Sequence, residues 1–161
     1  MGLSDIAAGI EITEQQEERG VATVDTTDAS LAERLEPYEA ELPCSAGEAA
    51  TVLERYTAGG SVGAAGRAAG VAPVTAAKTL HLLGESVFPL GPIARDIITD
   101  LIRGEISRCD ALELTRASEA EFALAMYIET HGPIEEACTA IEGVLAGSAS
   151  PRTTRTDELL R

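Results

Sequence analysis

Tryptophan is absent from this sequence, aromatic residues make up 3% of it, and Lys78 is its only lysine. With so few large rings, the core must be built from aliphatic and small side chains. The sequence contains 27 alanines in 161 residues, a composition that favours closely packed helices over a sandwich of sheets. The length suits one compact domain, or two very small ones that share a core.

Paired cysteines and long apolar runs are also missing. Cys44, Cys109 and Cys138 are odd in number, far apart and without a CxxC pair, so we expect free thiols in a reducing compartment, not disulfides or a zinc site. No apolar run approaches the roughly 18 residues of a membrane span, and no basic segment followed by an apolar one forms a leader. These absences predict a soluble, cytoplasmic protein that does not contact a membrane.

Positive charge is scarce as well. Twenty-seven Asp and Glu residues face twelve Lys and Arg residues, which gives a formal net charge of -15. Molar intracellular salt selects acidic, lysine-poor, alanine-rich compositions, because carboxylates hold water and counter-ions while salt screens their repulsion. In this respect the chain resembles haloarchaeal proteins, and we expect it to be halophilic. An ordinary acidic bacterial protein is the alternative.

Helix signals recur along most of the chain. Three capping boxes, in which Ser is followed three residues later by Glu, begin at Ser30, Ser45 and Ser118. Together with Gly and Pro breaks, they predict helices over residues 30–42 (bent or divided at Pro37), 45–58, 62–69, 73–83, 93–103, 107–115 and 118–130, and a last one after Pro133 that ends at 146.

These signals predict an all-α fold, a multi-helix bundle that contains one or two helix-turn-helix units. Residues 30–146 form the expected helical domain. Residues 1–29 are polar and weakly patterned, which predicts a flexible N-terminal arm, and residues 147–161 have the composition of a disordered tail.

The segment 61–84 reads SVGAAGRAAGVAPVTAAKTLHLLG. Ala69-Gly70-Val71 at a turn, Thr75 at the start of the following helix, and inward-facing Leu80 and Leu83 resemble a helix-turn-helix of the resolvase or homeodomain-like kind. Such a turn requires a left-handed residue, which glycine adopts readily. Gly66 stands where alanine is usual in the first helix, and we expect it to weaken that helix by about 1 kcal/mol.

Charge within this region departs from the rest of the chain. Residues 55–84 contain no Asp or Glu, whereas the overall composition would place about five there. The resemblance and this window predict double-stranded DNA as a partner, with Arg67 on the backbone, Thr75 and Lys78 on bases or phosphates, and His81 near a phosphate. Burial of the whole segment is the alternative explanation.

A second candidate unit spans residues 104–132. It is similar to the helix-turn-helix module of small prokaryotic antitoxin-like proteins, on the residues Gly104, Ile106, Ser107, Ala111, Glu113, Leu114, Ser118, Glu121 and Phe122. An offset of 46 residues aligns Ser61 with Ser107 and Ala65 with Ala111. Because this unit is acidic, we expect it to pack or dimerise and not to touch DNA.

No catalytic, metal or cofactor motif stands out. His81 and His131 are fifty residues apart and lack metal-ligand spacing, and no GxSxG, GKS/T or GxGxxG occurs. We therefore expect no enzyme and no cofactor. The leading hypothesis is a DNA-binding transcriptional regulator of a halophile. The alternative is a helical protein-interaction or antitoxin-like module.

Apolar residues on two of the expected helices exceed the needs of a small core. They are Ile93, Ile97, Leu101, Phe122, Met126 and Tyr127, and they predict a homodimer.

Overall fold

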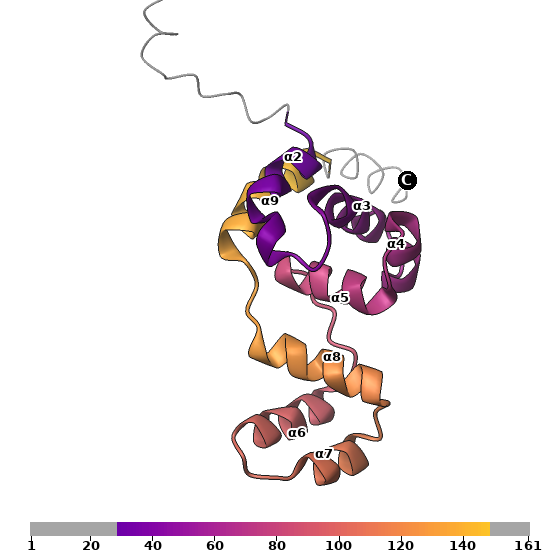
Figure 1. Ribbon diagram of the computed structural model, residues 1–161, viewed down its shortest axis with the longest axis vertical. Helices are drawn as coiled ribbons and strands as arrows, with labels where there is room; N and C mark the ends of the chain where they lie inside the picture. The colour runs from indigo at the N-terminus through magenta and orange to yellow at the C-terminus, as the bar shows by residue number, and fades with distance from the viewer. Residues whose placement is uncertain (1–28, 149–161) are drawn as a thin grey trace, which may run out of the picture. The chain divides into compact units, whose positions relative to one another are not determined.

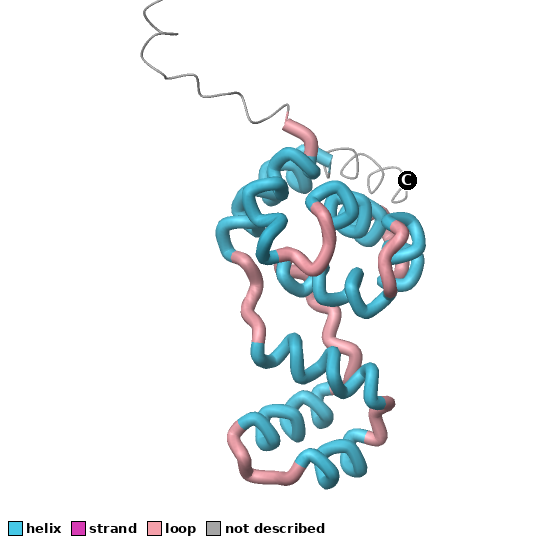
Figure 2. Tube along the Cα trace, viewed as in Figure 1, coloured by secondary structure: helices cyan, strands magenta, loops and turns pink. Residues whose placement is uncertain are grey.

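The computed structural model describes residues 29–148, which form helices joined by loops and contain no strand (Figures 1 and 2). The chain divides into two units, residues 1–30 and 31–161, and every described helix belongs to the second. The helices are α2 (Leu31–Leu35), the 3-10 helix η1 (Glu36–Glu41), α3 (Ala46–Thr57), α4 (Val62–Ala69), α5 (Pro73–Leu82), α6 (Pro92–Ile102), α7 (Arg108–Thr115), α8 (Glu119–Thr130) and α9 (Glu135–Ser148). The predicted all-α bundle is confirmed.

Two of the predicted segments fall mostly outside this range. The arm at 1–29 lies outside the described residues except for Ala29, and the tail at 147–161 lies outside them from residue 149 onward. Helix α9 continues through Ser148, two residues beyond the predicted end.

Local sequence signals explain where helices begin and divide. Pro37 separates α2 from η1, because proline has no N–H to continue an α-helix. Ser45 and Ser118 each accept from the backbone N–H three residues on, and Glu48 and Glu121 accept from the cap backbone in return. These two capping boxes satisfy N–H groups that the helix cannot pair internally.

Helices α3, α4 and α5 pack around one core, which α2 and α9 cover from the side of α3 (Figure 1). Its buried members include Leu35, Val52, Leu53, Leu80 and Ile141. Burying one aliphatic side chain stabilises the fold by about 1.5–3 kcal/mol, and this is the main stabilising contribution here. Helix α9 therefore belongs to the first core although it follows the second in sequence.

Helices α6, α7 and α8 form a second, smaller core. Four residues are buried in it, namely Ile98, Ala111, Phe122 and Ala125, and half-buried neighbours such as Leu101 and Met126 pack around them. Since its interior is small, this core depends on its contact with the first for part of its burial. That contact is made by α5 and α8.

The two three-helix groups are repeats related by a shift of 46 residues. Shifting α4 by 46 gives the bounds of α7, and shifting α3 and α5 gives those of α6 and α8 to within two residues. Gly70 and Arg116, 46 residues apart, both have a left-handed backbone, at φ 73° and 52°. The pairs Val52–Ile98, Ala65–Ala111 and Ala76–Phe122 are buried in both groups. We call α3–α5 the first repeat and α6–α8 the second repeat.

The packing of α4 against α5 explains why glycine stands at position 66, although glycine is a poor helix former. A Cβ at this position would lie 3.0 Å from the carbonyl oxygen of Val71 and 3.4 Å from Cβ of Ala76. Helices α4 and α5 cross closely at this point, and the Val71 N–H bonds to the carbonyl of Gly66 at 2.9 Å. Gly66 is expected to weaken α4 as an isolated helix. It also allows a close approach of α5 that an alanine side chain would obstruct.

The described cysteines are free thiols, as the sequence predicts. Burial raises the pKa of the Cys44 and Cys138 thiols, whereas Cys109 is exposed. Between residues 29 and 148, no helix is long and apolar enough to cross a membrane.

Candidate functional site

Helix α5, expected to read DNA, has one face in the first core and the opposite face against α8. Ala76, Leu80 and Leu82 are buried in the core. The opposite face carries Val74, Lys78 and His81, which are spaced by four and three residues and so lie along one stripe. This stripe is the part of the helix that would meet a DNA groove.

Two residues of the stripe contact the second repeat directly. Lys78 Nζ lies 4.5 Å from the centroid of the Tyr127 ring. His81 Nε2 donates to the carbonyl oxygen of His131 at 2.5 Å. The His131 ring in turn stacks on Tyr127, with ring centroids 4.0 Å apart and planes at 15°. We call this set of contacts the α5–α8 interface.

The interface brings together the outward stripes of the third helices of the two repeats. Under the shift of 46, the counterparts of Val74, Lys78 and His81 are Ala120, Leu124 and Tyr127. Lys78 therefore contacts the counterpart of His81. Each repeat presents the outward stripe of its third helix to the other.

The four predicted DNA-contacting residues are only partly brought together. Lys78 and His81 lie in the α5–α8 interface, and Thr75 is half-buried, with its carbonyl accepting from the Thr79 hydroxyl at 2.8 Å. Arg67 is exposed in the last turn of α4. Tyr127 and His131 complete the interface and were not among the predicted residues. The 46-residue offset was the signal in the sequence that could have pointed to Tyr127.

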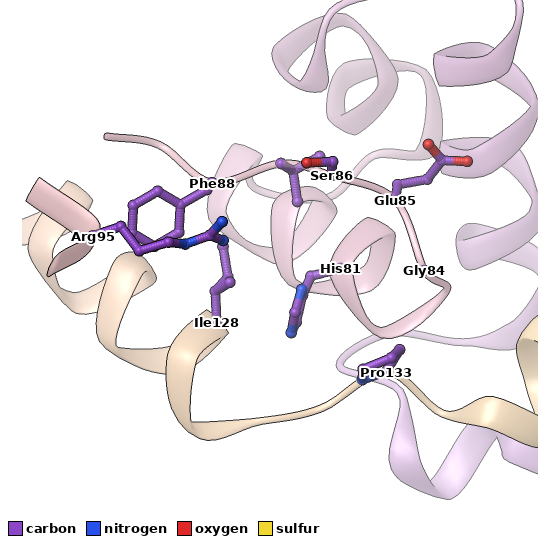
Figure 3. A pocket seen from close by; sticks show the side chains of 9 residues that line it. His81, Gly84, Glu85, Ser86, Phe88, Arg95, Ile128 and Pro133 are labelled. Atoms are coloured by element: carbon purple, nitrogen blue, oxygen red, sulfur yellow. The ribbon is translucent and has the colours of Figure 1, made fainter. Parts of the chain in front are cut away.

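A small cavity of about 210 Å³ flanks the interface beside His81 (Figure 3). The guanidinium of Arg95 lies over the Phe88 ring, 4.1 Å from its centroid, and Figure 3 shows the Glu85 carboxylate turned away from both. Arg95 Nε also pairs with Glu129 at 2.6 Å. Its charge is therefore already compensated within the fold.

An apolar cavity of about 430 Å³ lies on the other side of the interface. Its walls come from the first repeat, from Val87, Phe88 and Pro89 of the loop before α6, and from the start of α8. Glu121 is the one charged residue in its lining, and the backbone N–H of Ser118 lowers the pKa of that carboxyl. The cavity can take apolar groups and offers few polar partners.

A third cavity, of about 650 Å³, lies entirely within the second repeat. It is lined by Leu101, Ile102, Arg108, Phe122, Ala123, Met126 and Thr130. Arg108 pairs with Glu119 at 2.5 Å, which raises its pKa, and its guanidinium lies 5.3 Å from the Phe122 ring centroid. Ile102 remains 44% exposed at its edge. We call this cavity the second-repeat groove.

Burial raises the pKa of the Tyr127 hydroxyl, so the phenol stays neutral beneath the Lys78 cation. Within residues 29–148, no three His, Cys, Asp or Glu side chains are grouped so that they could hold a metal ion. What the described surface offers is apolar cavities beside the third helices of the two repeats.

Comparison with known proteins gives a family but no described activity. The model of a family described as "Family of unknown function (DUF7858)" matches residues 1–161, so the chain belongs to that family. No curated protein and no solved structure matches the chain.

Proposed function

For this member of a family of unknown function, we propose the role of a protein-interaction module and not that of a DNA reader. One observation carries the proposal. The outward stripe of α5, which would enter a DNA groove, is in contact with α8 through Lys78 and His81. The module is built from two repeats whose third helices face each other, and its free surfaces lie elsewhere.

Dimensions argue against DNA at this stripe. The major groove of B-form DNA is about 12 Å wide and admits one helix, and a helix with its side chains is roughly 10–12 Å across. With α8 packed on its outward stripe, α5 is half of a two-helix layer that is too thick for the groove. DNA would have to displace α8 before Lys78 could reach a base.

Burial explains part of the lack of carboxylates in residues 55–84 without DNA. Half of α5 and two residues of α4 are buried, where an unpaired carboxylate would be costly. Ala65, Gly66, Ala76, Ala77, Thr79, Leu80, Leu82 and Leu83 are all in this class. Lys78 and His81 on the outward stripe contact the second repeat, whose α8 carries Glu119, Glu121 and Glu129, whereas Val74 at the start of the stripe is 43% exposed.

DNA binding remains the second candidate function, because two observations favour it. Helices α4 and α5 are joined by a tight turn at Gly70 of the kind that helix-turn-helix proteins use. Arg67 is exposed and has no carboxylate within its own helix. This candidate requires that α8 separate from α5 when DNA binds.

A selection with two arms distinguishes the candidates. The full chain in 2 M KCl is exposed to fragments of a genomic DNA library in one arm and to a displayed library of extended peptides in the other. The interaction-module proposal predicts enriched peptides and no enriched DNA. Enriched DNA fragments would instead support DNA binding. In that case, fluorescence anisotropy should show binding that Arg67→Glu weakens at least tenfold and that Glu135→Gln leaves unchanged. A tenfold loss corresponds to about 1.4 kcal/mol.

A further inference from the structure

The second-repeat groove has a counterpart in the first repeat. Under the shift of 46, Ile102, Arg108 and Ala123 of the groove correspond to Tyr56, Val62 and Ala77. Those three residues line the 430 Å³ cavity of the first repeat. The two cavities therefore occupy the same place in each repeat, between the end of the first helix, the start of the second and the middle of the third.

In the first repeat, a loop segment of the chain itself lies beside this place, together with the start of α8. Val87, Phe88 and Pro89 follow α5 and line the same cavity as Tyr56, Val62 and Ala77. Val87 packs against the first core, and Phe88 packs against the second. Beneath this loop and the start of α8, Ala77 is 4% exposed.

In the second repeat, no such segment follows. The chain after α8 turns back to the first repeat, where the Ile134 N–H donates to the carbonyl of Leu82 at 2.8 Å and Ile134 is buried in the first core. All lining residues of the second-repeat groove come from α6, α7 and α8. Met126, the counterpart of Leu80, is therefore half-buried, and Ala123, the counterpart of Ala77, is exposed.

The charge of the groove limits what it can take. The one charged residue of its lining, Arg108, is paired with Glu119. The groove therefore favours an uncharged apolar group over a charged one. The flexible Met126 side chain suits a surface that adapts to an inserted apolar group.

We infer that the second-repeat groove binds an extended, proline-containing apolar segment of another protein, chemically similar to this chain's own residues 86–90. The inference rests on the proposed function and names its surface and partner. The segment inserts a valine or a similar side chain between Ile102, Ala123 and Met126. Its backbone lies across the start of α7, beside Arg108.

The test uses a fluorescein-labelled peptide with the sequence of residues 85–91 and the full chain in 2 M KCl, with binding followed by anisotropy. Ala123→Arg fills the groove from an exposed helical position without burying a charge, and it weakens binding at least tenfold. Ala68→Arg, the same change at an exposed position of α4, leaves binding unchanged. A peptide in which serine replaces the residues equivalent to Val87 and Phe88 does not bind.

Other outcomes overturn the inference. Peptide binding that is absent, or equal in the wild type and Ala123→Arg, excludes this segment from the groove. A dimer detected by light scattering that Ala123→Arg dissociates identifies a second copy of the chain as the occupant instead. If the displayed library yields peptides whose binding Ala123→Arg does not weaken, the protein is an interaction module but the second-repeat groove is not its binding site. If the library yields no peptides while DNA is enriched, both the interaction module and the groove as its site are wrong.

Discussion

Lys78 Nζ lies 4.5 Å from the centre of the Tyr127 ring, on the stripe of α5 that would otherwise face solvent. A cation over an aromatic face contributes about 0.5–1 kcal/mol at an exposed site and more where water is excluded. The only lysine of an acidic chain is thus used to join its two repeats. This contact supports the interaction-module proposal, because Lys78 would have to leave the Tyr127 ring before it could contact DNA.

Gly66→Ala is expected to destabilise the protein by at least about 1 kcal/mol, although alanine is the better helix former. The new Cβ would meet the Val71 carbonyl at 3.0 Å, and that carbonyl belongs to the tight turn between α4 and α5 and has little room to move. Gly47→Ala is the matched control, since nothing lies within 4 Å of a Cβ there. It should stabilise by about 0.5–1 kcal/mol. Urea titration in molar KCl measures both. A stabilising Gly66→Ala would contradict the close crossing.

Substitution of the left-handed residue in the turn of each repeat should change the stability of the protein in opposite directions. Gly70→Ala should cost about 1 kcal/mol, because a Cβ disfavours this conformation by roughly 1–2 kcal/mol. Arg116→Gly should relieve that strain at φ 52° and stabilise by about 0.5 kcal/mol after glycine's greater entropy loss. The same denaturant titrations apply. Effects of the same sign at both positions would show that the turns are not equivalent.

Stability should fall in acid partly through the two capping boxes. Hydrogen bonds from the backbone N–H groups of Ser45 and Ser118 lower the pKa of Glu48 and Glu121 below 4.5. A carboxyl with a lowered folded-state pKa stabilises the fold above its unfolded pKa, and this contribution is lost as the pH falls through the folded pKa. The double variant Glu48→Gln, Glu121→Gln keeps the caps without the charge. Its free energy of unfolding should therefore decline less than that of the wild type between pH 5 and pH 3. Parallel curves would contradict the assignment.

Much of this fold could be predicted from local signals, because capping residues, prolines and glycines act on their own neighbours. Pro37, Ser45, Gly70 and Ser118 each end or begin an element where expected. Which face of α5 stays free could not be predicted in this way. That depends on α8, some fifty residues later, whose contact with Lys78 follows from the packing of the two repeats.

In the sequence the repeat leaves few identities, among them Ser61–Ser107, Ala65–Ala111 and Ala77–Ala123. Some equivalent positions keep their burial and not their residue type, as Val52 and Ile98 or Ala76 and Phe122 do. Arg116 in place of glycine hides the second turn for the same reason, since an arginine can adopt a left-handed backbone at a modest cost. Identity between repeats fades while the packing persists.

The halophilic character inferred from composition predicts a dependence on salt. With a net charge of -15, self-repulsion is screened over ~3 Å at 1 M salt but extends over ~10 Å at 0.1 M. We expect the circular dichroism signal of the helices, and the melting temperature, to fall markedly when KCl is diluted from 2 M to 0.1 M. An unchanged melting curve across this range would refute the halophilic assignment.

NMR at Lys78 shows whether the outward stripe of α5 lies against α8. Because Lys78 is the only lysine, reductive methylation with ¹³C-formaldehyde places one side-chain reporter in the chain, and the modified amine keeps its charge. In 2 M KCl its methyl signal should be shifted upfield by the Tyr127 ring and should return to the position of free dimethyllysine in Tyr127→Leu. A wild-type signal already at the free position would show that Lys78 is exposed on α5, and would contradict the account.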